Sequence, residues 1–182
     1  MKNRFPASLR YCGSVMMLLM ALAFGCATYA QTVTIPGTKA QFTFPSEWSY
    51  LNTEQIDKNT SAYIYYYSAQ YVVDENDTTL PFMRIIVRKN YSASLFDFVF
   101  ERYASSPYQS LEDYTEGIGL PSSGGMGYVG AYTNVRDEKD YQFRMVYFKE
   151  KNTVVELRLE TTRGTFPLME EEFLSILRSL KF

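Results

Sequence analysis

Histidine is absent from the 182-residue chain, and its only cysteines are Cys12 and Cys26. Without histidine, neither a Ser-His-Asp triad nor a Cys-His pair can form. Both cysteines fall within the first 30 residues, so residues 31–182 contain no thiol nucleophile, no zinc site built from Cys and His, and no disulfide. These absences exclude several large classes of hydrolase and zinc protein.

A cluster of basic residues is also absent. The chain has 18 Lys and Arg against 20 Asp and Glu, and residues 1–30 hold three of the bases and none of the acids. Residues 31–182 therefore contain 15 bases and 20 acids, which gives a net charge of −5. An acidic chain without a basic cluster argues against nucleic acid and against an anionic membrane surface as partners.

The acidic residues show no pattern typical of carboxylate catalysis. They occur as neighbours in predicted turns or at a helix start, at Glu112 and Asp113, at 137–140 and at 170–172. No two carboxylates are predicted to face each other across a cleft, as glycoside hydrolysis requires. The acidic segment 74–79 lacks the central Gly and the distal Glu of an EF-hand loop. We therefore predict a protein that is not an enzyme and that uses no cofactor or metal.

The first 30 residues have the features of an export signal. Three basic residues precede the apolar run 15–24, which is short for a bilayer span, and small residues precede Gln31. We predict a signal peptide over residues 1–30, cleaved between Ala30 and Gln31. The mature protein would then lie in the periplasm or cell envelope, or be secreted.

A lipoprotein signal is the alternative to simple cleavage. Residues 22–26, Leu-Ala-Phe-Gly-Cys, resemble a lipobox, although Ala23 and Phe24 fit that pattern poorly. In that case Cys26 would carry a lipid and anchor the chain to a membrane. Under either reading, residues 31–182 form one domain, because 152 residues suffice to bury roughly 70% of the unfolded surface.

The clearest structural signal lies in the last forty residues. Apolar and polar residues alternate over 141–149 and again over 154–160, and Lys151 and Asn152 lie between these segments. This pattern predicts an antiparallel hairpin with one buried and one solvated face. After Gly164 the apolar residues recur at helical spacing, which predicts a helix that covers the buried face of the hairpin.

The preceding segments predict further strands and one more helix. Strands are expected at 32–35, 41–44, 61–73, 82–89 and 128–132, and residues 52–60 read as a loop or a short helix. Ser94 and Asp97 form a capping-box pattern for a helix over 94–104, with Leu95, Phe98, Val99 and Tyr103 on one stripe. The predicted fold is α+β: an antiparallel sheet with helices packed on its faces, as in an α/β/α sandwich.

Tyrosines dominate the predicted strand 61–73. Tyr63, Tyr65, Tyr67 and Tyr71 fall on one face of it. On an open sheet face, these rings could hold a sugar or a side chain of a partner protein. The alternative is that a helix covers one face, and that the other carries a cross-strand ladder of tyrosines.

A glycine-rich connection over 109–127 is the second candidate for contact with a partner. Gly124, Gly125 and Met126 precede a strand, whereas a phosphate-binding loop would precede a helix. The segment therefore reads as a long hairpin-type connection, and the less favoured alternative is a functional lip. The candidate binding surface comprises Tyr63, Tyr65, Tyr67, Tyr71, Gly124, Gly125 and Met126.

Two motifs resemble the PsbP-like family. They are Phe42-Thr-Phe-Pro-Ser-Glu-Trp48, which is similar to that family's opening, and the ending over 173–182, where the family often has a helix and a short apolar tail. The competing interpretation of Trp48 is a core residue that closes one end of the sheet. The family includes photosystem subunits, a Ran-binding nuclear-transport factor and bacterial envelope proteins. The resemblance implies the same fold and a role in binding proteins.

Three functional hypotheses follow. The first is a non-enzymatic envelope protein that binds an unknown partner protein. The second is a protein that binds a small molecule or a glycan through the tyrosine-rich strand. The third, which the sequence favours least, is a carboxylate hydrolase.

Overall fold

A computed structural model describes residues 30–67, 79–113, 120 and 124–182. The strands are β1 (Gln31–Thr34), β2 (Gln41–Phe44), β3 (Trp48–Asp57), β4 (Thr60–Tyr67), β5 (Phe82–Arg88), β6 (Ser110–Asp113), β7 (Gly125–Asn134), β8 (Lys139–Glu150) and β9 (Thr153–Thr162). The helices are α2 (Leu95–Ala104) and α3 (Phe166–Arg178).

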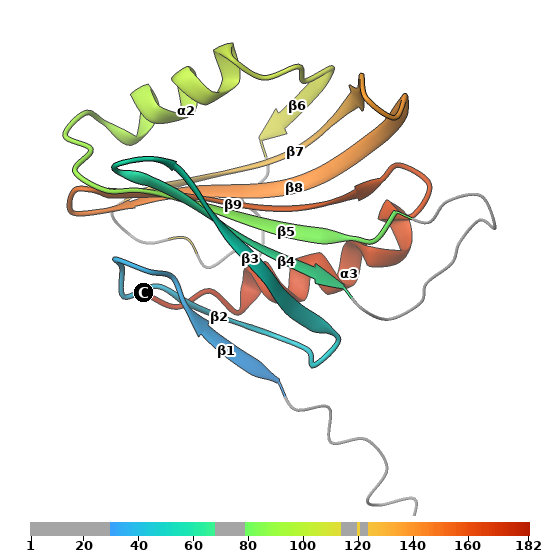
Figure 1. Cartoon of the computed structure of the whole chain (residues 1–182), viewed down its shortest axis with the longest axis horizontal. Helices are drawn as coiled ribbons and strands as arrows, with labels where there is room; N and C mark the ends of the chain where they lie inside the picture. The colour runs from blue at the N-terminus through green and yellow to red at the C-terminus, as the bar shows by residue number, and fades with distance from the viewer. Residues whose placement is uncertain (1–29, 68–78, 114–119, 121–123) are drawn as a thin grey trace, which may run out of the picture.

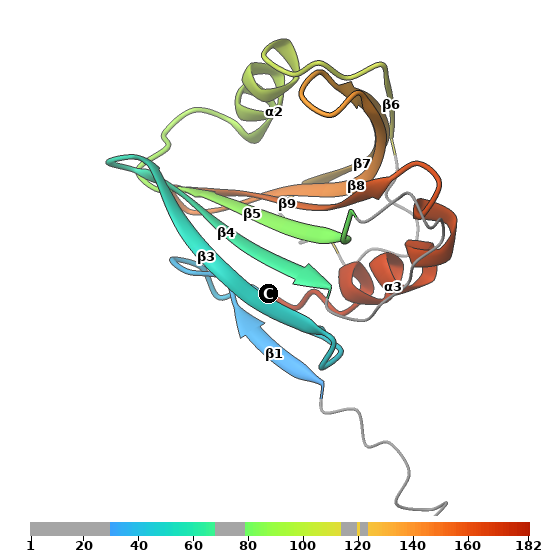
Figure 2. The ribbon, with the colours of Figure 1, turned by 45° about the vertical axis from the view of Figure 1, so that its right-hand side comes forward.

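The described strands form two antiparallel sheets. The larger one has seven strands in the order β3-β4-β5-β9-β8-β7-β6, and β1 pairs with β2 in a separate ribbon. Helices α2 and α3 lie on opposite sides of the larger sheet (Figure 1), and the turned view shows β1 on the same side as α3 (Figure 2). The structure confirms the predicted α+β fold with helices on both faces.

The β8–β9 hairpin supplies the middle of the sheet. Ten residue pairs join the two strands. Lys151 and Asn152 connect them, and Lys151 has a φ of 55°, which suits a two-residue hairpin turn. Directly paired residues point to the same face of a sheet, and successive residues point to opposite faces. This register assigns every strand residue to one of two faces.

We name the two faces after the helices that cover them. Val155, Leu157 and Leu159 of β9 belong to the α3 face and are fully buried in its core. The intervening Glu156 and Arg158 belong to the α2 face, as do Phe143, Met145 and Tyr147 of β8.

The larger core lies on the α3 face. The buried residues of α3 are Phe166, Met169, Phe173, Leu174, Ile176 and Leu177. Phe42 and Phe44 of β2 cover the part of the sheet beside α3. Trp48 is buried against Phe44, and its indole Nε1 donates a hydrogen bond to Glu172 of α3 at 3.1 Å. This burial confirms that Trp48 is a core residue.

Helix α2 begins with the predicted capping box. The backbone N–H of Asp97 donates to the Ser94 hydroxyl at 3.1 Å, and the Asp97 carboxylate accepts from the Ser94 backbone N–H at 3.0 Å. Phe98 and Val99 are buried in a second, smaller core that includes Tyr147. Helix α2 therefore covers the β8 part of its face.

Three segments differ from the sequence-based predictions. Residues 52–60 lie mostly in β3 rather than in a loop or helix, because β3 is an edge strand whose residues after Trp48 lie largely in solvent and need no apolar alternation. Strand β6 lies within the predicted connection 109–127, and β7 begins at Gly125, before the predicted start. The last part of the predicted strand 61–73 and the acidic segment 74–78 lie outside the described residues.

Candidate functional site

The predicted tyrosine surface is part of the core. Tyr65 and Tyr67 are only 8% and 5% exposed, and Tyr63 is half-buried against the same cluster. The β1–β2 ribbon covers Tyr65, whose ring centroid lies 5.5 Å from that of Phe44. The expectation that these rings lie on an open face is wrong for Tyr65 and Tyr67. Their face is covered, as the alternative supposed, but strand β2 and not a helix lies over Tyr65. Tyr71 lies outside the described residues.

The predicted glycine lip retains access to solvent. Gly124 is exposed and has a φ of 99°, and Gly125 and Met126 are half-buried at the start of β7. A cavity of about 290 Å³ lies beside them and is lined by Asp113, Gly125, Met126, Gly127 and Tyr128. Burial, assisted by Asp113, raises the pKa of Tyr128, so this phenol stays neutral. Such a cavity can receive a small side chain of a partner.

The face predicted to be solvated carries buried charges. Glu156 and Glu160 are 0% and 1% exposed. Arg102 of α2 reaches down to Glu156, and its Nε lies 2.8 Å from a carboxylate oxygen. Arg158 pairs with Glu160 at 3.2 Å, and Tyr132 donates to Glu160 at 2.7 Å. The alternation of β9 is therefore one of apolar and ion-paired residues.

The electrostatics of this network follow from its burial. Burial raises the pKa of Glu160, and Arg158 and Tyr132 oppose that shift. Burial alone would lower the pKa of Arg158, but Glu160 and Glu156 outweigh it and raise that pKa. Charges of both signs are thus matched inside the protein, which is typical of a structural network. Sequence alternation cannot distinguish this network from a solvated face, because it does not show that a helix lies above it.

An exposed aromatic stripe runs along α2 and was missed by the sequence analysis. Phe96, Phe100 and Tyr103 are 65%, 62% and 51% exposed. The rings of Phe96 and Phe100 are stacked, with centroids 6.5 Å apart and an interplanar angle of 18°. Tyr103 was predicted to belong to the covered stripe and belongs instead to this one. We call these three residues the α2 stripe.

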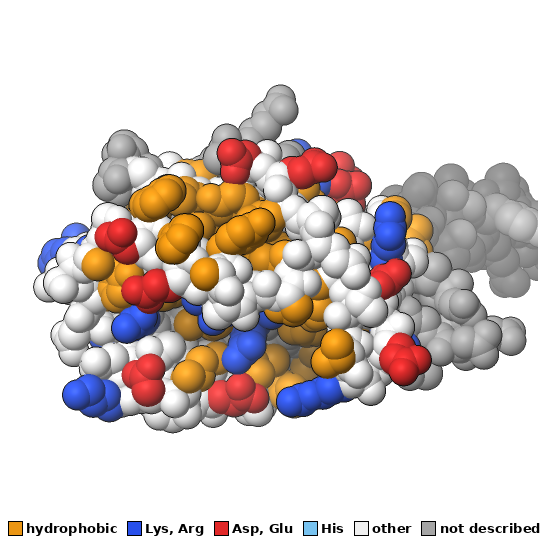
Figure 3. All heavy atoms as spheres, turned by 90° about the horizontal axis from the view of Figure 1, so that it is seen from above, with side chains coloured by type: hydrophobic (Ala, Val, Ile, Leu, Met, Phe, Trp, Pro, Cys, Tyr) orange, Lys and Arg blue, Asp and Glu red, His pale blue; other side chains and the backbone are white. Residues whose placement is uncertain are grey.

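The view onto α2 shows how this side of the molecule is composed. Hydrophobic side chains gather over α2, and acidic and basic side chains lie around them (Figure 3). The spacing of the stripe, i, i+4 and i+7, places its three members on one flank of the helix. Six of the ten α2 residues are apolar or aromatic and large, so the helix has more of them than one covered face needs. That excess was the signal available in the sequence.

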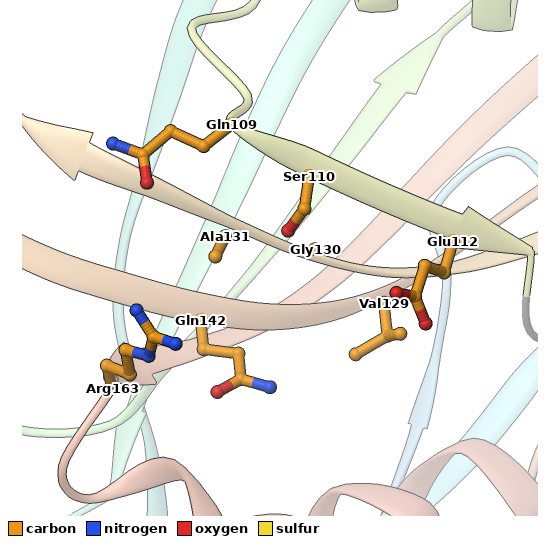
Figure 4. A pocket seen from close by; sticks show the side chains of 8 residues that line it. All are labelled: Gln109, Ser110, Glu112, Val129, Gly130, Ala131, Gln142 and Arg163. Atoms are coloured by element: carbon orange, nitrogen blue, oxygen red, sulfur yellow. The ribbon is translucent and has the colours of Figure 1, made fainter.

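A second feature lies on the opposite face of the sheet. A cavity of about 250 Å³ is lined by Gln109, Ser110, Glu112, Val129, Gly130, Ala131, Gln142 and Arg163. Register places Ser110, Ala131 and Gln142 side by side across three strands, and Glu112 beside Val129. Figure 4 shows side chains from β6, β7, β8 and the end of β9 directed to the same side of the strands. We call this cavity the polar groove.

Clusters of metal ligands and membrane-spanning helices are both absent from the described residues. No group of three or more His, Cys, Asp or Glu side chains in them is placed to hold a metal ion. None of their helices is both long and apolar enough to cross a bilayer.

Solved structures of similar fold span nearly the same length of chain. LpqN, which is involved in cell envelope biogenesis of Mycobacterium tuberculosis, matches with a TM-score of 0.53 and 15% identity, over 84% of this chain and 91% of LpqN. The Ran-binding protein Mog1p of Saccharomyces cerevisiae matches with a TM-score of 0.51 and 8% identity, over 85% and 96%. CyanoP, the PsbP protein of Synechocystis sp. PCC 6803, matches with a TM-score of 0.50 and 11% identity, over 87% and 95%.

The chain has the PsbP-like fold. The resemblance seen in the sequence motifs is thus confirmed at the level of structure. At these identities, the PsbP-like fold is what the likeness establishes. No protein-family model matches the sequence, and no curated protein matches it. The function must therefore be argued from the surface of this chain.

Proposed function

We propose that this protein is an exported, non-enzymatic accessory protein of the cell envelope, and that it binds a partner protein through the α2 stripe. The exposure of Phe96, Phe100 and Tyr103 on one helix flank carries the proposal. Aromatic residues supply much of the binding energy at protein interfaces, and clustered exposed apolar groups mark interaction sites.

The chemistry around the stripe favours a protein partner over a membrane. Asp97 and Glu101 are exposed on the same helix, with Glu101 paired to Arg88 at 3.2 Å, and residues 31–182 carry a net charge of −5. Helices that bind lipid surfaces are rich in Lys and Arg on their polar face, because most such surfaces are anionic. The described part of α2 has one basic residue, Arg102, which points to Glu156. The expected partner has an apolar contact surface flanked by basic residues.

The proteins of similar fold support this direction. Mog1p is a Ran-binding protein, and LpqN is involved in cell envelope biogenesis. The first is consistent with a fold that presents a surface to another protein, and the second with an envelope location. Of the residues predicted from the sequence, Gly124, Gly125 and Met126 remain candidates for contact, because they border the 290 Å³ cavity.

The test is affinity capture from the native envelope, followed by reconstitution with the purified partner. We expect one stoichiometric protein to be captured by the parent chain. Phe100→Ala should weaken its binding about 30-fold, because truncation of a central aromatic at an interface costs about 2 kcal/mol or more. Leu168→Ala on α3 is the matched control, because Leu168 is 58% exposed.

The outcomes separate the alternatives. Equal binding by the parent, Phe100→Ala and Leu168→Ala chains would refute the assignment to α2. Binding to vesicles of anionic lipid, lost in Phe100→Ala, would instead identify the stripe as a membrane contact.

Export is tested separately by the intact mass of the chain purified from its own envelope. A chain that begins at Gln31 is expected from cleavage after Ala30. A chain that begins at a lipidated Cys26 would establish the lipoprotein alternative, and a full-length cytosolic chain would refute export.

A further inference from the structure

The polar groove lies on the face of the sheet opposite α2. Gln142 sits between Tyr141 and Phe143 in β8, and Phe143 belongs to the α2 face. Successive strand residues alternate between faces, so Gln142 and its neighbours Ala131 and Ser110 belong to the α3 face. The groove is therefore separate from the α2 stripe, and its ligand would not compete with a protein bound there.

The polar side chains of the groove are available to a ligand. Across the part of the chain that the structure describes, no hydrogen bond or ion pair engages the side chains of Ser110, Glu112, Gln142 or Arg163. Arg144 lies two residues after Gln142 in β8 and belongs to the same face. It differs from the groove residues because it is buried and paired with Glu170 of α3. On this face, the buried charge of Arg144 is therefore paired within the protein, whereas the charges of Glu112 and Arg163 meet solvent.

The two charges of the groove have opposite signs and lie at its two ends. Figure 4 shows Arg163 on one side, Glu112 on the other, and Gln142 between them. Glu112 belongs to β6 and Arg163 follows the end of β9, so the strands that carry them are three spacings, about 14 Å, apart. The two side chains form no ion pair with each other. A molecule that meets both must carry an anionic and a cationic end.

We propose that the polar groove binds a short peptide with free termini, about three residues long. Arg163 receives the terminal carboxylate, because guanidinium groups bind carboxylates through paired hydrogen bonds. Glu112 receives the terminal ammonium group. Gln142 donates to and accepts from the peptide backbone, and the small apolar Val129 and Ala131 form the floor.

Length selects the peptide. A single amino acid separates its charges by one carbon and cannot reach both ends of the groove. An extended chain adds roughly 3.3 Å per residue, so a tripeptide extends over about 10 Å, and the side chains of Arg163 and Glu112 cover the rest of the separation between their strands. A peptide of this length also suits a cavity of about 250 Å³.

Other ligand classes fit the lining less well. The residues that line the groove include no aromatic ring on which a sugar could stack. They include a single carboxylate, which is too few for a divalent cation. A phosphate group would meet a single arginine and no other basic side chain in this lining. The dipolar arrangement matches a zwitterion.

The experiment titrates the ¹⁵N-labelled chain with trialanine and follows amide shifts by NMR, with affinities from calorimetry. Trialanine with both termini blocked, as N-acetyl-trialanine amide, is the matched probe. We expect shifts confined to β6, β7, β8 and Arg163 with free trialanine, and none with the blocked form. Arg163→Gln should weaken binding about tenfold, since a hydrogen bond to a charged group is lost. Arg136→Gln, in the exposed β7–β8 turn, should have no effect.

Each outcome is decisive. Equal binding of free and blocked trialanine would show that the charges are not recognised and would overturn the proposal. Absence of shifts at millimolar trialanine would also overturn it. Shifts that survive in both Arg163→Gln and Glu112→Gln would place the peptide elsewhere. Because the α2 stripe lies on the other face, partner capture measured with Phe100→Ala succeeds or fails independently.

Discussion

Replacing Tyr65 with alanine tests whether the tyrosine-rich strand is core or surface. The ring of Tyr65 lies against those of Phe42, Phe44 and Tyr50, at centroid distances of 6.5, 5.5 and 5.6 Å. Truncation of a buried aromatic residue costs about 3–5 kcal/mol, through lost burial and the cavity that remains. Tyr65 keeps a small exposed area, so the lower end, about 3 kcal/mol, is expected.

The assay uses the single tryptophan of the chain. Trp48 is buried, and its ring centroid lies 5.4 Å from that of Tyr67, so its fluorescence reports on this core. For a domain of this size, a loss of about 3 kcal/mol lowers the Tm by roughly 10 °C. Phe100→Ala, on the exposed α2 stripe, should change the unfolding free energy by less than about 0.5 kcal/mol. An unchanged Tm for Tyr65→Ala, or a large drop for Phe100→Ala, would refute the assignment of core and surface.

Three further predictions concern charges and backbone. Arg102→Ala leaves the carboxylate of Glu156 buried and unpaired, and should lower the free energy of unfolding in urea by about 2–3 kcal/mol. The loss is smaller if water enters and solvates the carboxylate. An unchanged urea midpoint would contradict the buried network. Hydrogen bonds from Ser94 hold the pKa of Asp97 below its ordinary value of 3.8. The stability that the ionised Asp97 confers is therefore complete above pH 3.8, and it is lost as the pH falls through the lower pKa of the folded state. Asp97→Asn should therefore be less stable than the parent at about pH 6 and equal to it at about pH 2; a constant difference would be inconsistent with that linkage. A Cβ at Gly130 would lie 2.7 Å from a backbone oxygen of β6, so Gly130→Ala should expel β6 and expose its amides to hydrogen exchange, whereas unaltered exchange would count against the close approach.

Much of the fold could be predicted from local pattern. The hairpin of β8 and β9 and the helix α3 each follow a single period over ten or more residues, and each buries one apolar stripe. Ser94 and Asp97 predict the start of α2, because a capping box needs both residues at that spacing. The PsbP-like motifs around Trp48 pointed to the same overall arrangement.

The candidate site was harder to predict, because burial depends on distant segments. Tyr65 is covered by β2, which lies about twenty residues earlier in the chain, and strand alternation cannot show which face receives that cover. The alternation of Glu156 and Glu160 with apolar residues looks the same whether the carboxylates meet water or Arg102 and Arg158. Strand β3 could not be predicted from the polar residues after Trp48, because an edge strand with one neighbour need not bury alternate side chains.

The α2 stripe illustrates the opposite error. Leu95, Phe98 and Val99 are enough to predict a covering helix, so the sequence pattern does not require the additional aromatics to form a second surface. Only the packing of α2 shows that Phe96 and Phe100 remain in solvent while Phe98 is buried.

The most direct test of the central proposal is photo-crosslinking in the intact envelope. A photoreactive phenylalanine analogue replaces Phe100 in one chain and Leu168 in another, since both side chains are exposed, on α2 and α3 respectively. The proposal predicts one discrete crosslinked protein from position 100 and none from position 168. The same products from both positions, or crosslinks only to lipid from position 100, would contradict a protein-binding role for α2.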